Sequence, residues 1–158
     1  VFLVVLYLDF AGARWWALGI FIVACLTDFV DGYIARHYNQ ITNFGKFMDP
    51  LADKMLVMAA MCYFVEYGQM PGWCLAIVLL REFAVSGMRL VAVEQGRVIA
   101  AAWSGKVKTA STMVCLCLML VFQSNLLNVV CIAVIVATTV YSGIEYFAKN
   151  LDVFKEAD

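Results

Sequence analysis

The stretch TDFVDGYIARHYNQITNFGKFMDPLADK, residues 27–54, decides the architecture of this chain because it places four aspartates inside an otherwise apolar sequence. They are Asp28, Asp31, Asp49 and Asp53. A carboxylate near the middle of a bilayer costs roughly 2.5–3.5 kcal/mol on insertion scales, so four of them need compensating charge. Bound cations are the expected compensation.

Helical spacing groups these carboxylates into two pairs. Asp28 and Asp31 are three residues apart, and Asp49 and Asp53 are four apart, so each pair would share one face of a helix. Carboxylate oxygens suit hard cations such as Mg²⁺ and Mn²⁺, whereas no Cys or His stands at a spacing typical of zinc or copper ligands. We therefore expect a site for two Mg²⁺ ions, with Mn²⁺ as the alternative, between two facing helices.

The residues between the two pairs favour a phosphate ligand. Gly32 has no side chain and lets a ligand approach the backbone closely, and Arg36 offers a guanidinium that matches phosphate oxygens. The polar run 37–43 and Gly45 mark a turn between the two helices. The segment as a whole predicts a site for metal ions and a diphosphate.

The complete pattern resembles the signature of the CDP-alcohol phosphotransferases, which are integral membrane enzymes of phospholipid synthesis. Eight identities over 26 positions carry this resemblance: Asp28-x-x-Asp31-Gly32-x-x-Ala35-Arg36 and Gly45-x-x-x-Asp49-x-x-x-Asp53. Two later segments resemble the phosphatidylglycerophosphate synthases of that family: Arg81-Glu82-x-x-x-Ser86-Gly87-x-Arg89, and Gly96-x-Val98-Ile99-Ala100-Ala101-x-Trp103-x-Gly105-Lys106-x-Lys108-Thr109.

The resemblance implies a role for each matching residue. Asp28, Asp31 and Asp49 would bind the metal ions, and Asp53 would be a ligand or near-ligand that also takes the proton from the attacking hydroxyl. The cytidine diphosphate would be held by Gly32, Ala35, Arg36 and Gly45. The candidate ligands for a second, phosphate-bearing substrate are four cations: Arg81, Arg89, Lys106 and Lys108. Their structural alternatives are neutralisation of the first arginine by Glu82 and interfacial anchoring by the two lysines.

The implied reaction transfers a phosphatidyl group from CDP-diacylglycerol to sn-glycerol 3-phosphate and releases CMP. Other members of the family use inositol phosphate, serine or phosphatidylglycerol as the acceptor, and only residues 81–109 favour glycerol phosphate. A divalent-cation transporter is the alternative from a different class, although we find no internal repeat of the kind that transporters usually show. A purely structural bundle leaves the four carboxylates unexplained. The resemblance also implies a homodimer.

The composition is that of a membrane protein. Hydrophobic residues make up 65% of the 158 residues and charged residues only 15%, far from the balance of an average soluble domain. The net charge of -1 and the absence of a Lys- or Arg-rich run argue against a nucleic-acid partner. We expect one domain, residues 1–158, that folds as an all-α bundle of six membrane helices, the first of them truncated.

The six expected spans follow the apolar runs of the sequence: residues 1–10, about 15–36, 45–67, 73–94, 106–122 and 128–149. Nearly all Lys and Arg residues close to the expected turns lie on one side of these spans. By the positive-inside rule, that side faces the cytoplasm and carries the aspartate motif and the C-terminus. The expected location is a bacterial inner membrane, with the lipid bilayer and both substrates as partners.

Overall fold

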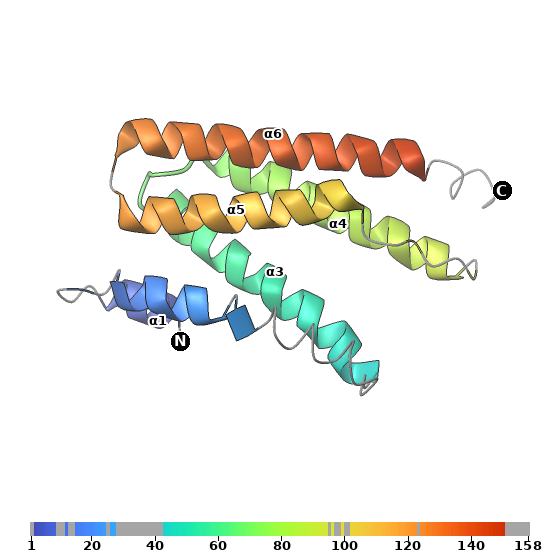
Figure 1. Cartoon of the computed structure of the whole chain (residues 1–158), viewed down its shortest axis with the longest axis horizontal. Helices are drawn as coiled ribbons and strands as arrows, with labels where there is room; N and C mark the ends of the chain where they lie inside the picture. Colours follow the sequence, from blue (N-terminus) through green and yellow to red (C-terminus); the bar gives the residue numbers. More distant parts are fainter. Residues whose placement is uncertain are drawn as a thin grey trace.

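The computed structural model describes residues 2–8, 12, 15–24, 26–27, 43–94, 96, 99, 102–122 and 124–150, and for residues 43–53 it describes the helical backbone alone. Within these residues the regular structure is entirely α-helical, which confirms the predicted all-α class. The helices are α1 (Phe2–Tyr7), α3 (Asn43–Glu66), α4 (Gly72–Glu94), α5 (Trp103–Val121) and α6 (Asn125–Lys149), with a shorter apolar helix at Trp15–Ala24 (Figure 1).

Two of these helices, α5 and α6, are long and apolar enough to cross a membrane. They have 19 and 25 residues, so a rise of about 1.5 Å per residue makes them about 28 and 37 Å long, against about 30 Å of bilayer hydrocarbon. Helices α3 and α4 are of similar length, with 24 and 23 residues, but they carry five and four charged residues. The count of six spans stays a prediction.

The turn between α3 and α4 reverses the chain. Gly68 has φ = 66°, a left-handed conformation that glycine adopts without steric cost. Its N–H donates to the Val65 carbonyl at 3.1 Å, and the Gln69 N–H donates to the Phe64 carbonyl at 2.8 Å. This pair of hydrogen bonds is the Schellman arrangement that ends a helix. It confirms the chain reversal expected between the predicted spans 45–67 and 73–94, and α4 runs back alongside α3.

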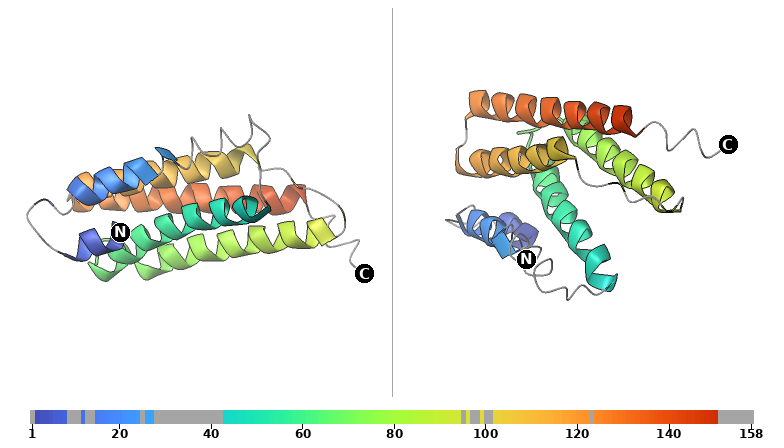
Figure 2. Two further views of the ribbon diagram at one scale, coloured as in Figure 1. Left: turned by 90° about the horizontal axis from the view of Figure 1, so that it is seen from below. Right: turned by 45° about the vertical axis from the view of Figure 1, so that its right-hand side comes forward.

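Buried apolar side chains gather at the end of the bundle where α3 meets α4 and α5 meets α6. They include Met61 and Phe64 of α3, Val78 of α4, Leu116 of α5 and Ile135 of α6, none more than 1% exposed. Each lies in the half of its helix nearest these two turns. Consecutive helices run in opposite directions, so these halves come together at one end of the bundle (Figure 2). This end of the bundle is therefore its hydrophobic core.

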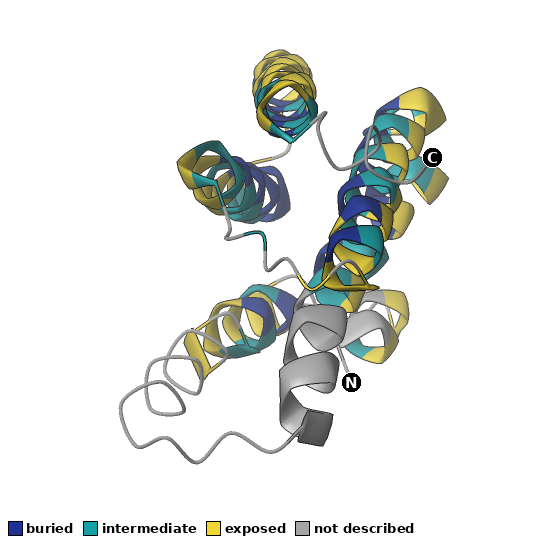
Figure 3. Ribbon diagram, turned by 90° about the vertical axis from the view of Figure 1, so that its right-hand side faces the viewer, coloured by how far each residue is buried: buried dark blue, intermediate teal, exposed yellow. Residues whose placement is uncertain are grey.

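The outward sides of the helices are also apolar. Leu80 and Phe83 of α4 are each 72% exposed, and Leu126 of α6 is 77% exposed. Seen along the bundle, the exposed positions lie mainly on the outer sides of the helices and the buried ones on the sides that face one another (Figure 3). An apolar surface of this extent suits a hydrocarbon environment and not water.

The opposite end of the bundle carries the charged residues. It is formed by the first half of α3, the second half of α4, the start of α5 and the end of α6 (Figure 1). Six cations of the predicted positive side belong to these segments: Lys46, Lys54, Arg89, Lys106, Lys108 and Lys149. The candidate ligands Arg89, Lys106 and Lys108 thus lie away from the hydrophobic core, at the end that the sequence assigned to the cytoplasm.

Candidate active site

The predicted metal and diphosphate residues fall largely outside the described part of the chain. This holds for five of them: Asp28, Asp31, Gly32, Ala35 and Arg36. Gly45, Asp49 and Asp53 belong to the first half of α3, and the two aspartate side chains are among those not described. Because Asp49 and Asp53 stand four residues apart in a continuous helix, they occupy one face of α3, as predicted.

Glu82, near the middle of α4, is the centre of a charged cluster that joins three helices. Its Oε1 atom accepts hydrogen bonds from Arg81 Nη1 at 2.9 Å and from Lys108 Nζ at 2.8 Å. Its Oε2 atom lies 3.4 Å from Lys54 Nζ. One carboxylate therefore contacts cations from α3, α4 and α5. We call these four residues the Glu82 cluster.

The Glu82 cluster carries more positive than negative charge in a largely buried place. The side chain of Lys108 is 5% exposed, those of Arg81 and Glu82 are each 12% exposed, and that of Lys54 is 36% exposed. Counted over these four described side chains alone, three cations against one carboxylate give a formal charge of +2. Burying uncompensated charge is costly, so this excess favours the binding of an anion. The composition of the cluster is that of an anion site.

Lys54 connects the Glu82 cluster to α3, the helix that carries Asp49 and Asp53. Its Nζ atom donates to Ser86 Oγ on α4 at 2.8 Å, in addition to its ion pair with Glu82. Lys54 directly follows Asp53 in α3. The contacts of Lys54 thus hold the polar side of α4 next to the segment of α3 that carries the predicted catalytic base.

Arg81 reaches from α4 to α6. Its Nη2 atom donates a hydrogen bond to the Ser142 hydroxyl, while its Nε atom finds no hydrogen-bond partner among the described residues. Two glycines leave room for this side chain. A Cβ atom at Gly105 would lie 3.5 Å from Arg81 Nη2, and one at Gly143 would lie 3.4 Å from Arg81 Cγ. Small residues on α5 and α6 therefore form the slot that the guanidinium occupies.

The other two predicted acceptor ligands lie outside the cluster. Arg89, two helical turns after Arg81, donates from Nε to the Tyr146 hydroxyl at 3.0 Å, and this tyrosine is buried between α4 and α6. Lys106 is exposed at the start of α5, with its Nζ atom 5.9 Å from the centre of the Trp103 ring. The structure thus brings Arg81 and Lys108 together and leaves Lys106 apart from them.

Sequence reasoning gave no binding or positioning role to four residues that contact these cations: Lys54, Ser86, Ser142 and Tyr146. A partial signal was present in α4, where positions 82, 86 and 89 have the i, i+4, i+7 spacing of one helix face. The partners on α3 and α6 left no comparable signal, because no spacing within the sequence shows which helices pack together.

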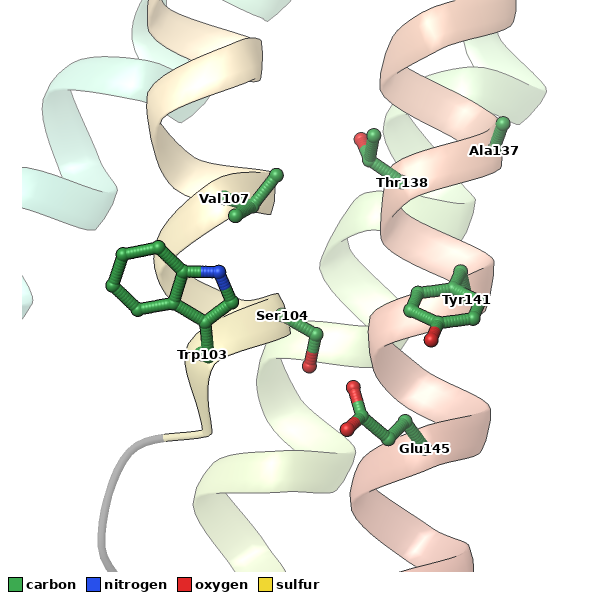
Figure 4. A pocket seen from close by; sticks show the side chains of 7 residues that line it. All are labelled: Trp103, Ser104, Val107, Ala137, Thr138, Tyr141 and Glu145. Atoms are coloured by element: carbon green, nitrogen blue, oxygen red, sulfur yellow. The ribbon is translucent and has the colours of Figure 1, made fainter.

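A groove of about 380 Å³ lies on the outer side of α5 and α6, apart from the Glu82 cluster. Trp103 and Tyr141 line it together with Glu145, whose carboxylate accepts a hydrogen bond from Lys149. Figure 4 shows Ser104 and Glu145 pointing toward one another across the groove. Its walls are otherwise mainly apolar.

The side chains that the structure describes include no group of three or more His, Cys, Asp or Glu residues that could hold a metal ion. The cysteines within this part of the chain are free thiols on the helices: Cys62, Cys74, Cys115, Cys117 and Cys131. The expectation of a metal site therefore depends on the aspartate motif. Its four carboxylates would supply the all-oxygen donor set that Mg²⁺ prefers, and two of them, Asp49 and Asp53, stand four residues apart in α3.

A helical bundle with an apolar outer surface and a largely buried cationic cluster is typical of a membrane protein with a polar site inside the bundle. Comparison with known families identifies the family to which this protein belongs. Residues 1–141 match the model of the CDP-alcohol phosphatidyltransferase family. The chain belongs to this family and is an enzyme of the CDP-alcohol phosphatidyltransferase class.

Relatives with assigned names agree with this membership. A CDP-diacylglycerol–glycerol-3-phosphate 3-phosphatidyltransferase of Bacillus subtilis is 43% identical over 145 residues, which cover 88% of this chain and 75% of the relative. A probable phosphatidylglycerophosphate synthase of Mycobacterium tuberculosis is 39% identical over 144 residues, covering 89% and 68%. A CDP-diacylglycerol–glycerol-3-phosphate 3-phosphatidyltransferase of Escherichia coli is 40% identical over 121 residues, covering 73% and 65%.

Proposed function

We propose that this enzyme transfers the phosphatidyl group of CDP-diacylglycerol to sn-glycerol 3-phosphate, giving phosphatidylglycerophosphate and CMP. The names of the relatives support this choice of substrates. The structural observation that carries it is the Glu82 cluster, a buried group with an excess of positive charge beside the helix of Asp49 and Asp53.

The charge of the cluster favours an acceptor that bears a phosphate monoester. Arg81 and Lys108 are its most buried cations, and both contact the same Glu82 oxygen, so one phosphate could contact both. The excess of two positive charges matches a phosphate dianion, whereas serine carries no net charge and phosphatidylglycerol carries one negative charge. Arg89 and Lys106 are the remaining proposed acceptor ligands. Inositol phosphate has the same charge as glycerol 3-phosphate, so the names of the relatives decide between these two.

The metal and donor sites are proposed from the family motif. Asp28, Asp31, Asp49 and Asp53 would hold two Mg²⁺ ions, and the cytidine diphosphate would lie against four further residues: Gly32, Ala35, Arg36 and Gly45. Mg²⁺ held by these carboxylates would neutralise the charge that develops on the phosphoryl oxygens. The shared helix face of Asp49 and Asp53 supports this arrangement.

The chain's own residues perform the proton and phosphoryl transfer. Arg81 and Lys108 hold the acceptor by its phosphate and leave its hydroxyl free to face α3. Asp53 takes the proton of that hydroxyl as the oxygen forms a bond to the lipid-side phosphorus of CDP-diacylglycerol. The bond between this phosphorus and the bridging oxygen breaks, and CMP leaves with the electron pair.

The proposed setting is a bacterial inner membrane, spanned by six helices, with the Glu82 cluster on the cytoplasmic side and two copies of the chain in the active unit. The exposed apolar surface and the gathering of cations at one end of the bundle support this topology. A site at the membrane surface suits the reaction, because one substrate lies in the bilayer and the other in water.

The test is release of CMP from CDP-diacylglycerol by the purified full-length protein in detergent with Mg²⁺, with and without glycerol 3-phosphate. We expect release that depends on the acceptor and that Asp53→Asn abolishes. Glu94→Gln serves as the matched control because Glu94 is an exposed carboxylate at the end of α4, away from the Glu82 cluster. Release with inositol phosphate or serine, and none with glycerol 3-phosphate, would refute the proposed acceptor.

A further inference from the structure

We infer that Glu82 is a positioning residue, which holds Arg81 and Lys108 at the separation that the acceptor phosphate requires and fixes both relative to α3. The inference rests on the proposed function, because it concerns the acceptor site of that reaction. It is derived from the contacts of this carboxylate, its burial and the charge around it.

The first step is geometric. Arg81 and Lys108 come from different helices, yet their cationic groups meet at one oxygen atom, Glu82 Oε1, at 2.9 and 2.8 Å. Two cations bound to a common oxygen lie close enough for the oxygens of a single phosphate to contact both. Glu82 thus sets the separation of two charges that the backbone of α4 and α5 leaves free to vary.

The second step is electrostatic. The side chains of Lys108 and Arg81 are 5% and 12% exposed, so their mutual repulsion is weakly screened by water. Without a carboxylate between them, these flexible side chains would turn away from each other. Glu82 offsets the repulsion and still leaves the cluster with a formal charge of +2. The carboxylate therefore organises the anion site without neutralising it.

The third step connects the acceptor site to the catalytic base. Glu82 Oε2 lies 3.4 Å from Lys54 Nζ, and the same ammonium donates to Ser86 at 2.8 Å. Lys54 follows Asp53 in α3. Through these contacts the carboxylate that sets the positions of Arg81 and Lys108 also fixes the distance between them and the segment of Asp53.

The same contacts argue against Glu82 as the base. Both of its oxygens already contact cations, Oε1 two of them and Oε2 one. A general base needs an oxygen within hydrogen-bond reach of the acceptor hydroxyl. Glu82 instead acts through the cations that it holds, which is the role of a positioning residue.

The test compares the two substrates in Glu82→Gln, which keeps the size of the side chain and removes its charge. We expect the KM for glycerol 3-phosphate to rise at least about tenfold, the effect of losing one charge-assisted hydrogen bond, while the KM for CDP-diacylglycerol changes less than about twofold. The inhibition constant of inorganic phosphate, competing with glycerol 3-phosphate, should rise by the same factor. Glu94→Gln should leave all three values unchanged.

Two further variants separate positioning from general damage. Glu82→Asp keeps the charge and should recover part of the acceptor KM. Glu82→Gln combined with Lys108→Gln returns the cluster to a formal charge of +2. Because Glu82 acts in part through Lys108, the rise in the KM for glycerol 3-phosphate in the double variant should be smaller than the product of the rises in the two single variants. If Glu82→Gln does not fold, the double variant is compared with Lys108→Gln alone: a further rise in the KM for glycerol 3-phosphate, with the KM for CDP-diacylglycerol unchanged, supports the inference, and equal acceptor KM values overturn it.

Two outcomes would overturn the inference. One is an unchanged KM for glycerol 3-phosphate in a folded Glu82→Gln protein, and the other is an equal rise of both KM values. Failure of the proposed function is distinguished by the unmodified protein, which would then release no CMP in response to glycerol 3-phosphate.

Discussion

Replacing Lys108 by methionine tests the assignment of the acceptor site most directly. Lys108 is 4% exposed as a residue, and its ammonium donates to Glu82 at 2.8 Å. Methionine keeps a long unbranched side chain and removes the charge, so the packing of α5 is largely preserved. The substitution therefore removes one of the two buried cations that are proposed to hold the acceptor phosphate.

The expected magnitudes follow from the contacts that Lys108→Met removes and those that remain. Glu82 keeps its hydrogen bond from Arg81 at 2.9 Å and its ion pair with Lys54, so the carboxylate is not left unpaired. We expect a loss of folding free energy of about 1 kcal/mol. A charge-assisted hydrogen bond to the phosphate is worth about 1.5–3 kcal/mol, which corresponds to a rise of roughly 10- to 150-fold in the KM for glycerol 3-phosphate.

The assay is CMP release at varied glycerol 3-phosphate and saturating CDP-diacylglycerol, with thermal unfolding in detergent as the measure of stability. Lys149→Met is the matched control, since this lysine side chain is 65% exposed and pairs with Glu145 at the surface, where ion pairs contribute little. A KM within twofold of the unmodified value in a folded Lys108→Met protein would refute the assignment of Lys108 to the acceptor site.

Three further substitutions probe the turn and the surroundings of the two arginines. Gly68→Ala should lower stability by roughly 1 kcal/mol without changing KM, because φ at this position is 66°. Tyr146→Phe removes the hydroxyl that accepts from Arg89 and should raise the acceptor KM several-fold. Gly143→Leu should abolish most acceptor-dependent CMP release, because its Cβ alone would lie 3.4 Å from Arg81 Cγ and the rest of the side chain would displace the arginine. Thermal unfolding and CMP release measure these effects.

Each of these predictions has a control or a contradicting result. Gly87→Leu is the control for Gly143→Leu, because a Cβ atom at Gly87 would meet no described atom within 4 Å apart from its own helix backbone and chain neighbours. Equal activity of the two leucine variants would contradict the proposed slot for Arg81. An unchanged acceptor KM in Tyr146→Phe would place Arg89 outside the acceptor site. An unchanged unfolding temperature in Gly68→Ala would show that the turn tolerates a side chain.

Much of the fold could be predicted from the sequence, because the hydrophobic runs are long and the turns contain glycine. The predicted helices at 45–67 and 73–94 are observed as Asn43–Glu66 and Gly72–Glu94. Helices α5 and α6 each begin three residues before the predicted starts at Lys106 and Asn128. Gly105 disfavours a helix on propensity alone. In the structure it belongs to α5, where its missing side chain leaves room for Arg81.

The candidate site could be predicted only in part. Arg81 and Lys108 were recognised as candidates, and Glu82 as a neutralising partner of Arg81. That Glu82 also contacts Lys54 and Lys108 depends on how α3, α4 and α5 pack against one another, and no spacing within a single helix encodes this. The roles of Asp28 and Asp31 stay predictions, because these residues lie outside the described part of the chain.

Helix α4 shows why hydropathy alone does not identify every expected span of this protein. Its outer side carries Leu80 and Phe83, each 72% exposed, while Glu82 and Ser86 face cations of the neighbouring helices. This is the reverse of a soluble amphipathic helix, whose polar side faces water. Such a helix is stable where hydrocarbon surrounds the bundle and the charges compensate one another inside it. Two of the charges that lower the hydropathy of α4, Arg81 and Glu82, belong to the proposed anion site, so a helix with a weaker membrane signal carries part of the proposed acceptor-binding set.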